Sequence, residues 1–171
     1  MTSLSFLSLT DLLLTKPPSL SLIKSTLEVL HLSRNRLNHI PDQYFEGLER
    51  LEHLELTGND LTSVPLDGLN GISAIYLNCN ELSTMPDFGK ISTNIQYIFV
   101  NDNNIAECGA LCTTEYPMLN VANVEGNRLQ SFPVDELLAN SPRIHQLILS
   151  DNPLRTMPTL KRSFNPEECE A

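Results

Sequence analysis

Two histidines and a glutamate are the residues whose types and spacing come nearest to a chemical site. His31 lies in the line "LEVLHLSRNRL" (27–37), and His53 and Glu55 lie in the similar line "LEHLELTGNDL" (51–61). Imidazole nitrogens and carboxylate oxygens are ligands that zinc accepts, and structural sites use four of them. The pattern supplies no third firm ligand. We therefore interpret the group as a solvated polar patch and predict no metal and no cofactor.

The cysteines offer a second kind of chemistry, with two interpretations. Cys108 stands where other copies of the pattern below carry an inward apolar residue, so a buried thiol that packs as a small hydrophobe is the first. Cys112 follows four residues later, and the two could form a disulfide if "CGALC" makes a tight turn. Cys79 and Cys169 would then be left without partners, which is awkward in a secreted protein.

The motifs of common enzymes and the features of nucleic-acid and membrane binding are missing from the sequence. It contains no glycine-rich phosphate loop, no pair of zinc-type cysteine doublets and no nucleophile elbow, so we expect no enzyme. The formal net charge of −10 disfavours a nucleic-acid partner or an anionic membrane surface. No apolar run reaches the roughly 18 residues of a membrane span. The start "LSFLSLTDLLL" lacks a basic leader and contains Asp11, so we interpret it as mature structure.

The elements that would position these residues are copies of one line. Similar lines begin at residues 27, 51, 72, 95, 119 and 144, at intervals of 24, 21, 23, 24 and 25 residues, and a degenerate copy begins at residue 4. Such a period is typical of a leucine-rich repeat. The alternating centre of each line predicts a short strand with leucines inward, and we expect these strands to stack in parallel. The sequence predicts one domain, 1–171, with about seven coils over 4–158 and a tail, 159–171.

An asparagine follows each of the six clear strands, where the chain turns away from the sheet. An amide offers two donors and an acceptor for backbone groups that stacked coils hide from water. We therefore predict an asparagine ladder made of Asn35, Asn59, Asn80, Asn103, Asn127 and Asn152. In the degenerate copy Leu12 takes the equivalent place.

The lines resemble the leucine-rich repeat family over roughly residues 4 to 158. The coil from Leu27 carries Ile40, Pro41, Phe45 and Leu48 at the places expected in the "typical" class of 24-residue repeats. The resemblance implies an α/β solenoid, a curved horseshoe with a parallel sheet on its concave face and short helical or irregular convex segments. It also implies non-catalytic recognition of a protein on the concave face, as in extracellular matrix proteoglycans and receptor ectodomains. Ala122, Cys108-Gly109 and the varying lengths depart from the class.

The sequence leaves alternatives for the location of the protein and for the chemistry of its partner. The repeat class favours an extracellular or cell-surface location, whereas the absence of glycosylation sequons argues against the secretory route and leaves a cytoplasmic scaffold or regulatory subunit as the alternative. The register places several carboxylates on the concave face, which is either a solvated surface or a site for a basic partner. The oligomeric state is not predicted.

The same register predicts where a protein partner would bind. Tyr76, Tyr97 and Phe99 should cluster on neighbouring strands about 4.8 Å apart, and exposed aromatic residues rimmed by charge are typical of binding hot spots. The alternative is an aromatic covering of the sheet without a partner. The candidate binding residues are Tyr76, Tyr97, Phe99, His31, His53, Glu55, Asn123 and Ile148.

Overall fold

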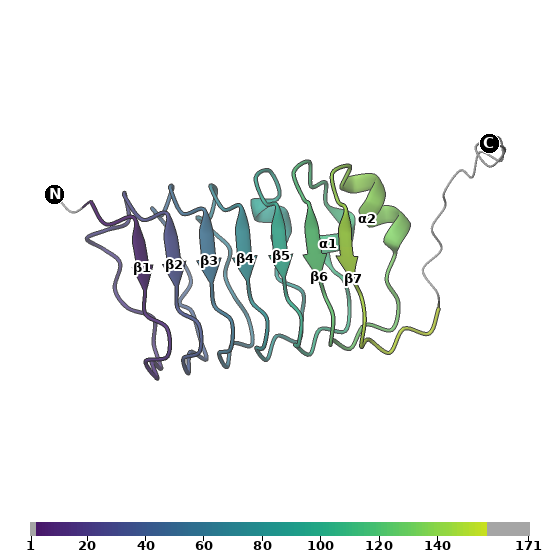
Figure 1. The fold of residues 1–171 in the computed structure, drawn as a ribbon, viewed down its shortest axis with the longest axis horizontal. Helices are drawn as coiled ribbons and strands as arrows, with labels where there is room; N and C mark the ends of the chain where they lie inside the picture. Colours follow the sequence, from purple (N-terminus) through teal and green to yellow (C-terminus); the bar gives the residue numbers. More distant parts are fainter. Residues whose placement is uncertain (1–2, 157–171) are drawn as a thin grey trace, which may run out of the picture.

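Seven short strands form one open parallel sheet in chain order (Figure 1). The structure is a computed structural model that describes residues 3–156, so Met157, Pro158, Cys169 and the predicted tail lie outside the described residues. The strands are β1 (Phe6–Ser8), β2 (Val29–His31), β3 (His53–Glu55), β4 (Ala74–Tyr76), β5 (Tyr97–Phe99), β6 (Val121–Asn123) and β7 (Gln146–Ile148).

The strand register follows the repeat without a slip. The middle residue of each strand pairs with the middle residue of the next, for example Leu30 with Leu54 and Ile75 with Ile98. These middle side chains are fully buried in β2 to β6, because alternate residues of a strand point to opposite faces. The first and third residues of each strand therefore form two columns on the other face, which we call the outer sheet face.

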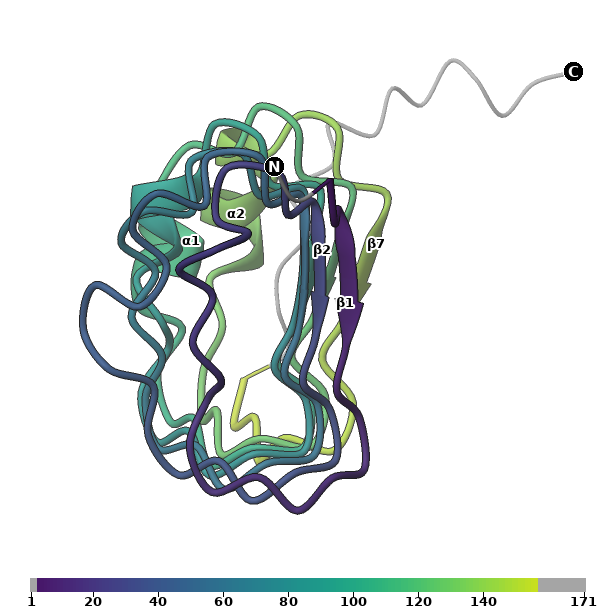
Figure 2. The ribbon, with the colours of Figure 1, turned by 90° about the vertical axis from the view of Figure 1, so that its left-hand side faces the viewer.

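The segments that return from one strand to the next lie on the opposite side of the coil from the sheet (Figure 2). The first return segments are turns, including residues 42–47. The later ones contain a 3₁₀ helix, η1 (Phe88–Ile91), and two α-helices, α1 (Ala110–Thr113) and α2 (Val134–Asn140). No helix in the described part of the chain is long and apolar enough to cross a membrane.

The core is a continuous column of apolar side chains between the sheet and the return segments. Leucines and isoleucines of successive coils fill it, and Phe45, Phe88 and Tyr116 are its largest fully buried members. Burial falls at the two ends, where Leu7 and Leu147 pack only partly. Each coil thus depends on its neighbours for burial, as expected for a solenoid.

The predicted asparagines form a ladder that links every coil to the one before it. Asn103 donates from Nδ2 to the carbonyl of Val100 in its own coil and to that of Leu77 in the preceding coil, both at 3.0 Å. Its Oδ1 accepts from the Leu82 amide of the preceding coil at 3.0 Å. Asn59, Asn80, Asn127 and Asn152 repeat this arrangement. Asn35 serves the degenerate coil, because its Oδ1 accepts from the amides of Leu12 and Leu14.

A residue with a positive φ angle precedes each ladder position, which the repeat pattern alone does not indicate. Glycine occupies this place in two coils, and side-chain-bearing residues occupy it in the others, at φ from 50° to 61°. The left-handed conformation is rare for such residues, although aspartate tolerates it better than most. The residues are Asp11, Arg34, Gly58, Cys79, Asp102, Gly126 and Asp151.

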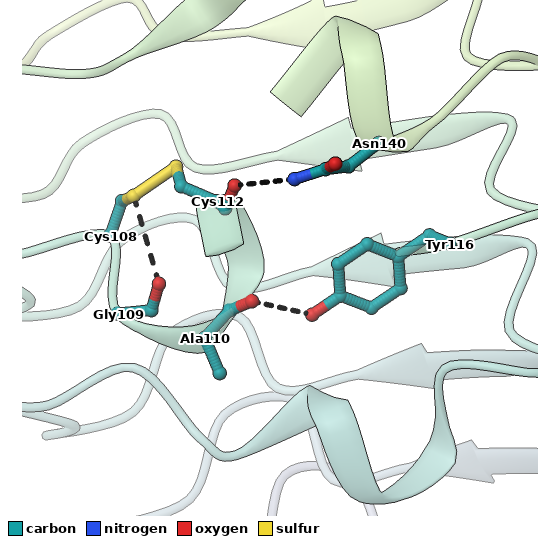
Figure 3. The surroundings of a disulfide bond; sticks show 6 residues. All are labelled: Cys108, Gly109, Ala110, Cys112, Tyr116 and Asn140. Atoms are coloured by element: carbon teal, nitrogen blue, oxygen red, sulfur yellow. Dashed lines mark hydrogen bonds between the residues drawn. A yellow bond between two sulfur atoms is a disulfide. The ribbon is translucent and has the colours of Figure 1, made fainter. Parts of the chain in front are cut away.

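The two cysteines of "CGALC" form a disulfide at helix α1 (Figure 3). Because Cys108 is bonded, it is not the free buried thiol of the first interpretation. Cys112 is fully buried and Cys108 is partly buried. Helix α1 is also tied to its surroundings, since the Tyr116 hydroxyl donates to the Ala110 carbonyl at 3.0 Å. Asn140 of α2 donates to the Cys112 carbonyl at 3.2 Å, which joins the two helices. Cys79 is a free, exposed thiol.

Candidate functional site

The outer sheet face carries an aromatic stack at its centre. Tyr76 of β4 and Phe99 of β5 are directly paired in the register, and their ring centroids lie 4.9 Å apart with planes inclined by 8°. Tyr97, two residues before Phe99 in β5, points to the same face and is 36% exposed. Parallel, offset rings of this kind attract each other beyond the burial of their surface. The structure therefore brings the three predicted aromatic residues to adjoining positions on two neighbouring strands.

Burial and charge act together on the Tyr76 hydroxyl. Partial burial raises the pKa of the Tyr76 phenol, and the nearby Glu55 carboxylate and Tyr97 raise it further. A higher pKa keeps the phenol neutral through the physiological range. The Tyr76 side chain therefore offers an uncharged ring and a hydroxyl beside a carboxylate.

A polar group adjoins the aromatic stack on the preceding strands. His31 Nδ1 and Glu55 Oε2 are 3.3 Å apart, and each side chain is about one-third exposed (31% and 32%). The His31 ring also lies against Phe6 of β1 in a T-shaped arrangement, with centroids 5.1 Å apart and planes at 73°. Phe6 is 52% exposed, and it was not among the candidate binding residues. Its place in the first copy of the line, in the same column as Tyr97, was the signal for it.

The remaining candidate binding residues are on the same face, but they are less exposed than the aromatic residues or lie apart from them. Asn123 of β6 is buried, and its Oδ1 accepts from the Glu125 amide at 3.0 Å. Ile148 of β7 is half-buried at the far end of the column, whereas His53 of β3 is exposed. Among residues 3–156, no three side chains of the types that bind metal ions come together.

The edge of the outer sheet face carries an ion pair that the sequence pattern does not predict. The Arg34 guanidinium donates from Nε to Asp11 Oδ1 at 2.8 Å and from Nη2 to Asp11 Oδ2 at 2.6 Å. This contact raises the pKa of Arg34 and lowers that of Asp11, chiefly through the hydrogen bonds. The two residues occupy the positive-φ position of successive coils, which is why they meet although 23 residues separate them.

The repeated line, the coil geometry and the asparagine ladder define a leucine-rich repeat solenoid. A family model described as "Leucine rich repeat" matches residues 25–82. The fold also matches the solved structure of a leucine-rich repeat protein from Leptospira interrogans, with a TM-score of 0.77 and 27% identity over 89% of this chain and 38% of that one. The chain belongs to the leucine-rich repeat family.

Two curated relatives are proteins of different types. Keratocan of Danio rerio is 34% identical over 165 residues, which are 94% of this chain and 46% of keratocan. Adenylate cyclase of Schizosaccharomyces pombe is 31% identical over 110 residues, 59% of this chain but only 6% of that protein. The chain thus spans less than half the length of either relative, and the second resemblance is too partial to carry the activity of the whole protein.

Proposed function

We propose that the chain is a non-catalytic protein-recognition module that binds a protein partner on its outer sheet face. The observation that carries this proposal is the cluster of Tyr76, Tyr97 and Phe99 at the centre of the sheet. Exposed aromatic side chains in the middle of a surface, surrounded by charged groups, commonly supply most of the binding energy at protein interfaces. Repeat solenoids present such extended faces to their ligands.

The test compares two variants in a pull-down from the native tissue, followed by titration with the captured partner. Tyr76→Ala with Phe99→Ala should weaken binding by about thirty-fold or more, because truncating central aromatic anchors costs about 2 kcal/mol or more. Glu46→Ala changes an exposed residue of a return segment and should leave binding unchanged. Circular dichroism checks that both variants fold. Equal binding by the aromatic variant and wild type would move the site away from the sheet centre.

We further propose that the module works outside the cell, as a matrix component or part of a surface receptor. The similarity to keratocan over nearly the whole chain favours the matrix class. The disulfide between Cys108 and Cys112 agrees with an oxidising compartment. An intracellular scaffold that holds a protein on the same face is the alternative, and the exposed free thiol of Cys79 favours it.

Thiol labelling of the protein from its native source, under denaturing conditions and without reductant, separates these locations. Protection of Cys108 and Cys112 supports the extracellular proposal, because cytosolic thiols are kept reduced. Labelling of all four cysteines would support the intracellular alternative. Rapid alkylation during lysis prevents oxidation after the cells are opened.

A further inference from the structure

The position between Glu55 and Tyr76 combines a carboxylate and an aromatic face on adjacent strands. The two residues are directly paired in the register of β3 and β4, and both point to the outer sheet face. Phe99 is stacked on one face of the Tyr76 ring, from the β5 side. Because the two rings are parallel, the other face of Tyr76 turns toward β3, where Glu55 is placed. We propose that this position binds an arginine side chain of the partner protein.

The Glu55 carboxylate has capacity left for such a ligand. Its Oε2 lies 3.3 Å from His31 Nδ1, while Oε1 makes no hydrogen bond within the described part of the chain. The carboxylate is about one-third exposed, so a ligand can reach it from solvent. A carboxylate accepts bonds on both oxygens, and a guanidinium donates from several nitrogens in one plane.

The protein's own nearby guanidinium is held elsewhere. Arg34 lies close enough to Glu55 for the carboxylate to contribute to its raised pKa. Its Nε and Nη2 nevertheless donate to Asp11, at 2.8 and 2.6 Å. Asp11 therefore takes up the hydrogen bonds of Arg34 Nε and Nη2, and the Glu55 carboxylate beside the Tyr76 ring is available for direct contact with a cation from outside.

Arginine suits this position better than lysine. A planar guanidinium can lie against the ring face of Tyr76 while its edge donates to Glu55, and arginine is the commoner partner in contacts between cations and aromatic rings. A lysine ammonium is a compact point charge that gains less from a flat surface. The net charge of −10 also favours a basic partner over an acidic one. This inference rests on the proposed function, since it names the anchor that the outer sheet face would take.

The test is a nuclear magnetic resonance titration of labelled protein with the peptide acetyl-Gly-Arg-Gly-amide. We expect saturable shifts of the Tyr76 ring and the Glu55 amide, with a dissociation constant in the millimolar range for a single side chain. The matched peptide with citrulline, which has the same shape without the charge, should give no saturable shift at these residues. The lysine peptide should bind at least threefold more weakly than the arginine peptide.

Three variants decide whether the contact is the proposed one. Glu55→Gln removes the charge and keeps the shape, and should weaken arginine binding about tenfold. Tyr76→Leu removes the ring and should weaken binding severalfold. Glu46→Gln makes the same change of charge on a return segment and should change nothing. The amide spectrum of each variant confirms that the fold is kept.

The inference and the proposed function fail in different ways. Equal shifts with the citrulline peptide, unchanged binding by Glu55→Gln, or no saturable shift up to about 100 mM peptide would overturn the arginine position. If the captured partner still needed the aromatic residues, the proposed function would stand without it. If instead the peptide bound as expected but the partner bound the aromatic variant as tightly as wild type, the proposed function would fail. The arginine position itself would remain.

Discussion

Replacing Asn103 by alanine should destabilise the protein by about 3 kcal/mol. The variant removes the contacts that the two Nδ2 hydrogens make with the carbonyls of Leu77, Val100 and Asn101, and the hydrogen bond that Oδ1 accepts from the Leu82 amide. The two carbonyls of Leu77 and Val100 each keep a second donor, because Asn80 also bonds to Leu77 and Asn127 also bonds to Val100. The Leu82 amide keeps none.

The magnitude follows from that difference between the groups. One buried N–H without a partner costs about 1–3 kcal/mol, and each carbonyl that loses one of two donors adds about 0.5 kcal/mol or less. Urea unfolding followed by circular dichroism measures the sum. We expect a lower midpoint with an unchanged slope, because the surface exposed on unfolding is nearly the same.

Two further variants serve as controls for Asn103→Ala. Leu12→Ala changes the equivalent position of the first coil, where the side chain is 52% exposed, and should cost about 0.5 kcal/mol or less. Asn152→Ala removes the last ladder residue, which is only half-buried, so water can replace some of the lost hydrogen bonds. Its effect should lie between the other two. If Asn103→Ala were as stable as Leu12→Ala, the hydrogen-bond argument for the ladder would be refuted.

Two further predictions concern alkaline pH and the glycines of the return segments. Burial raises the pKa of Tyr44 and Tyr116, so the folded state retains protons that the unfolded chain releases above about pH 10. The contribution of these tyrosines to the free energy of unfolding should be full below that pH and fall above it by about 1.4 kcal/mol per pH unit for each tyrosine. Urea titrations from about pH 9 to 11.5 measure this slope, and Tyr116→Phe should reduce it by the contribution of one tyrosine. Gly68 and Gly47 both have positive φ, but an added Cβ would lie 2.8 Å from the Phe45 carbonyl oxygen at Gly68 and 3.5 Å from the Lys24 side chain at Gly47. Gly47→Ala should therefore cost about 1 kcal/mol and Gly68→Ala about 3 kcal/mol or more, and equal unfolding midpoints would contradict the contact argument.

The fold was predictable from the sequence because the same pattern of inward apolar residues recurs in every copy of the repeat. A slip of one residue would place Leu54 and Ile75 in water, so the alternation alone determines which residues face outward. The asparagine ladder was predictable for the same reason, since an amide at a fixed place after each strand has one obvious use.

Contacts that depend on side-chain conformation or on unusual backbone were less predictable. Nothing in the sequence around Arg34 indicates a positive φ, and without it the pairing with Asp11 cannot be foreseen. The pattern places Asn123 in an outward column, but its bond to the Glu125 amide and its burial appear only with all neighbours in place.

The ladder also bears on how such an array changes length in evolution. Asn59 bonds to the Leu32 carbonyl and the Leu37 amide of the preceding coil. Asn80 bonds in the same way to the Leu56 carbonyl and the Leu61 amide, which belong to the coil of Asn59. Excising residues 59–79 would place Asn80 directly after Gly58, in the position that Asn59 holds now. One asparagine would still serve each junction between coils, so a gene can gain or lose a whole coil without any compensating substitution in the ladder.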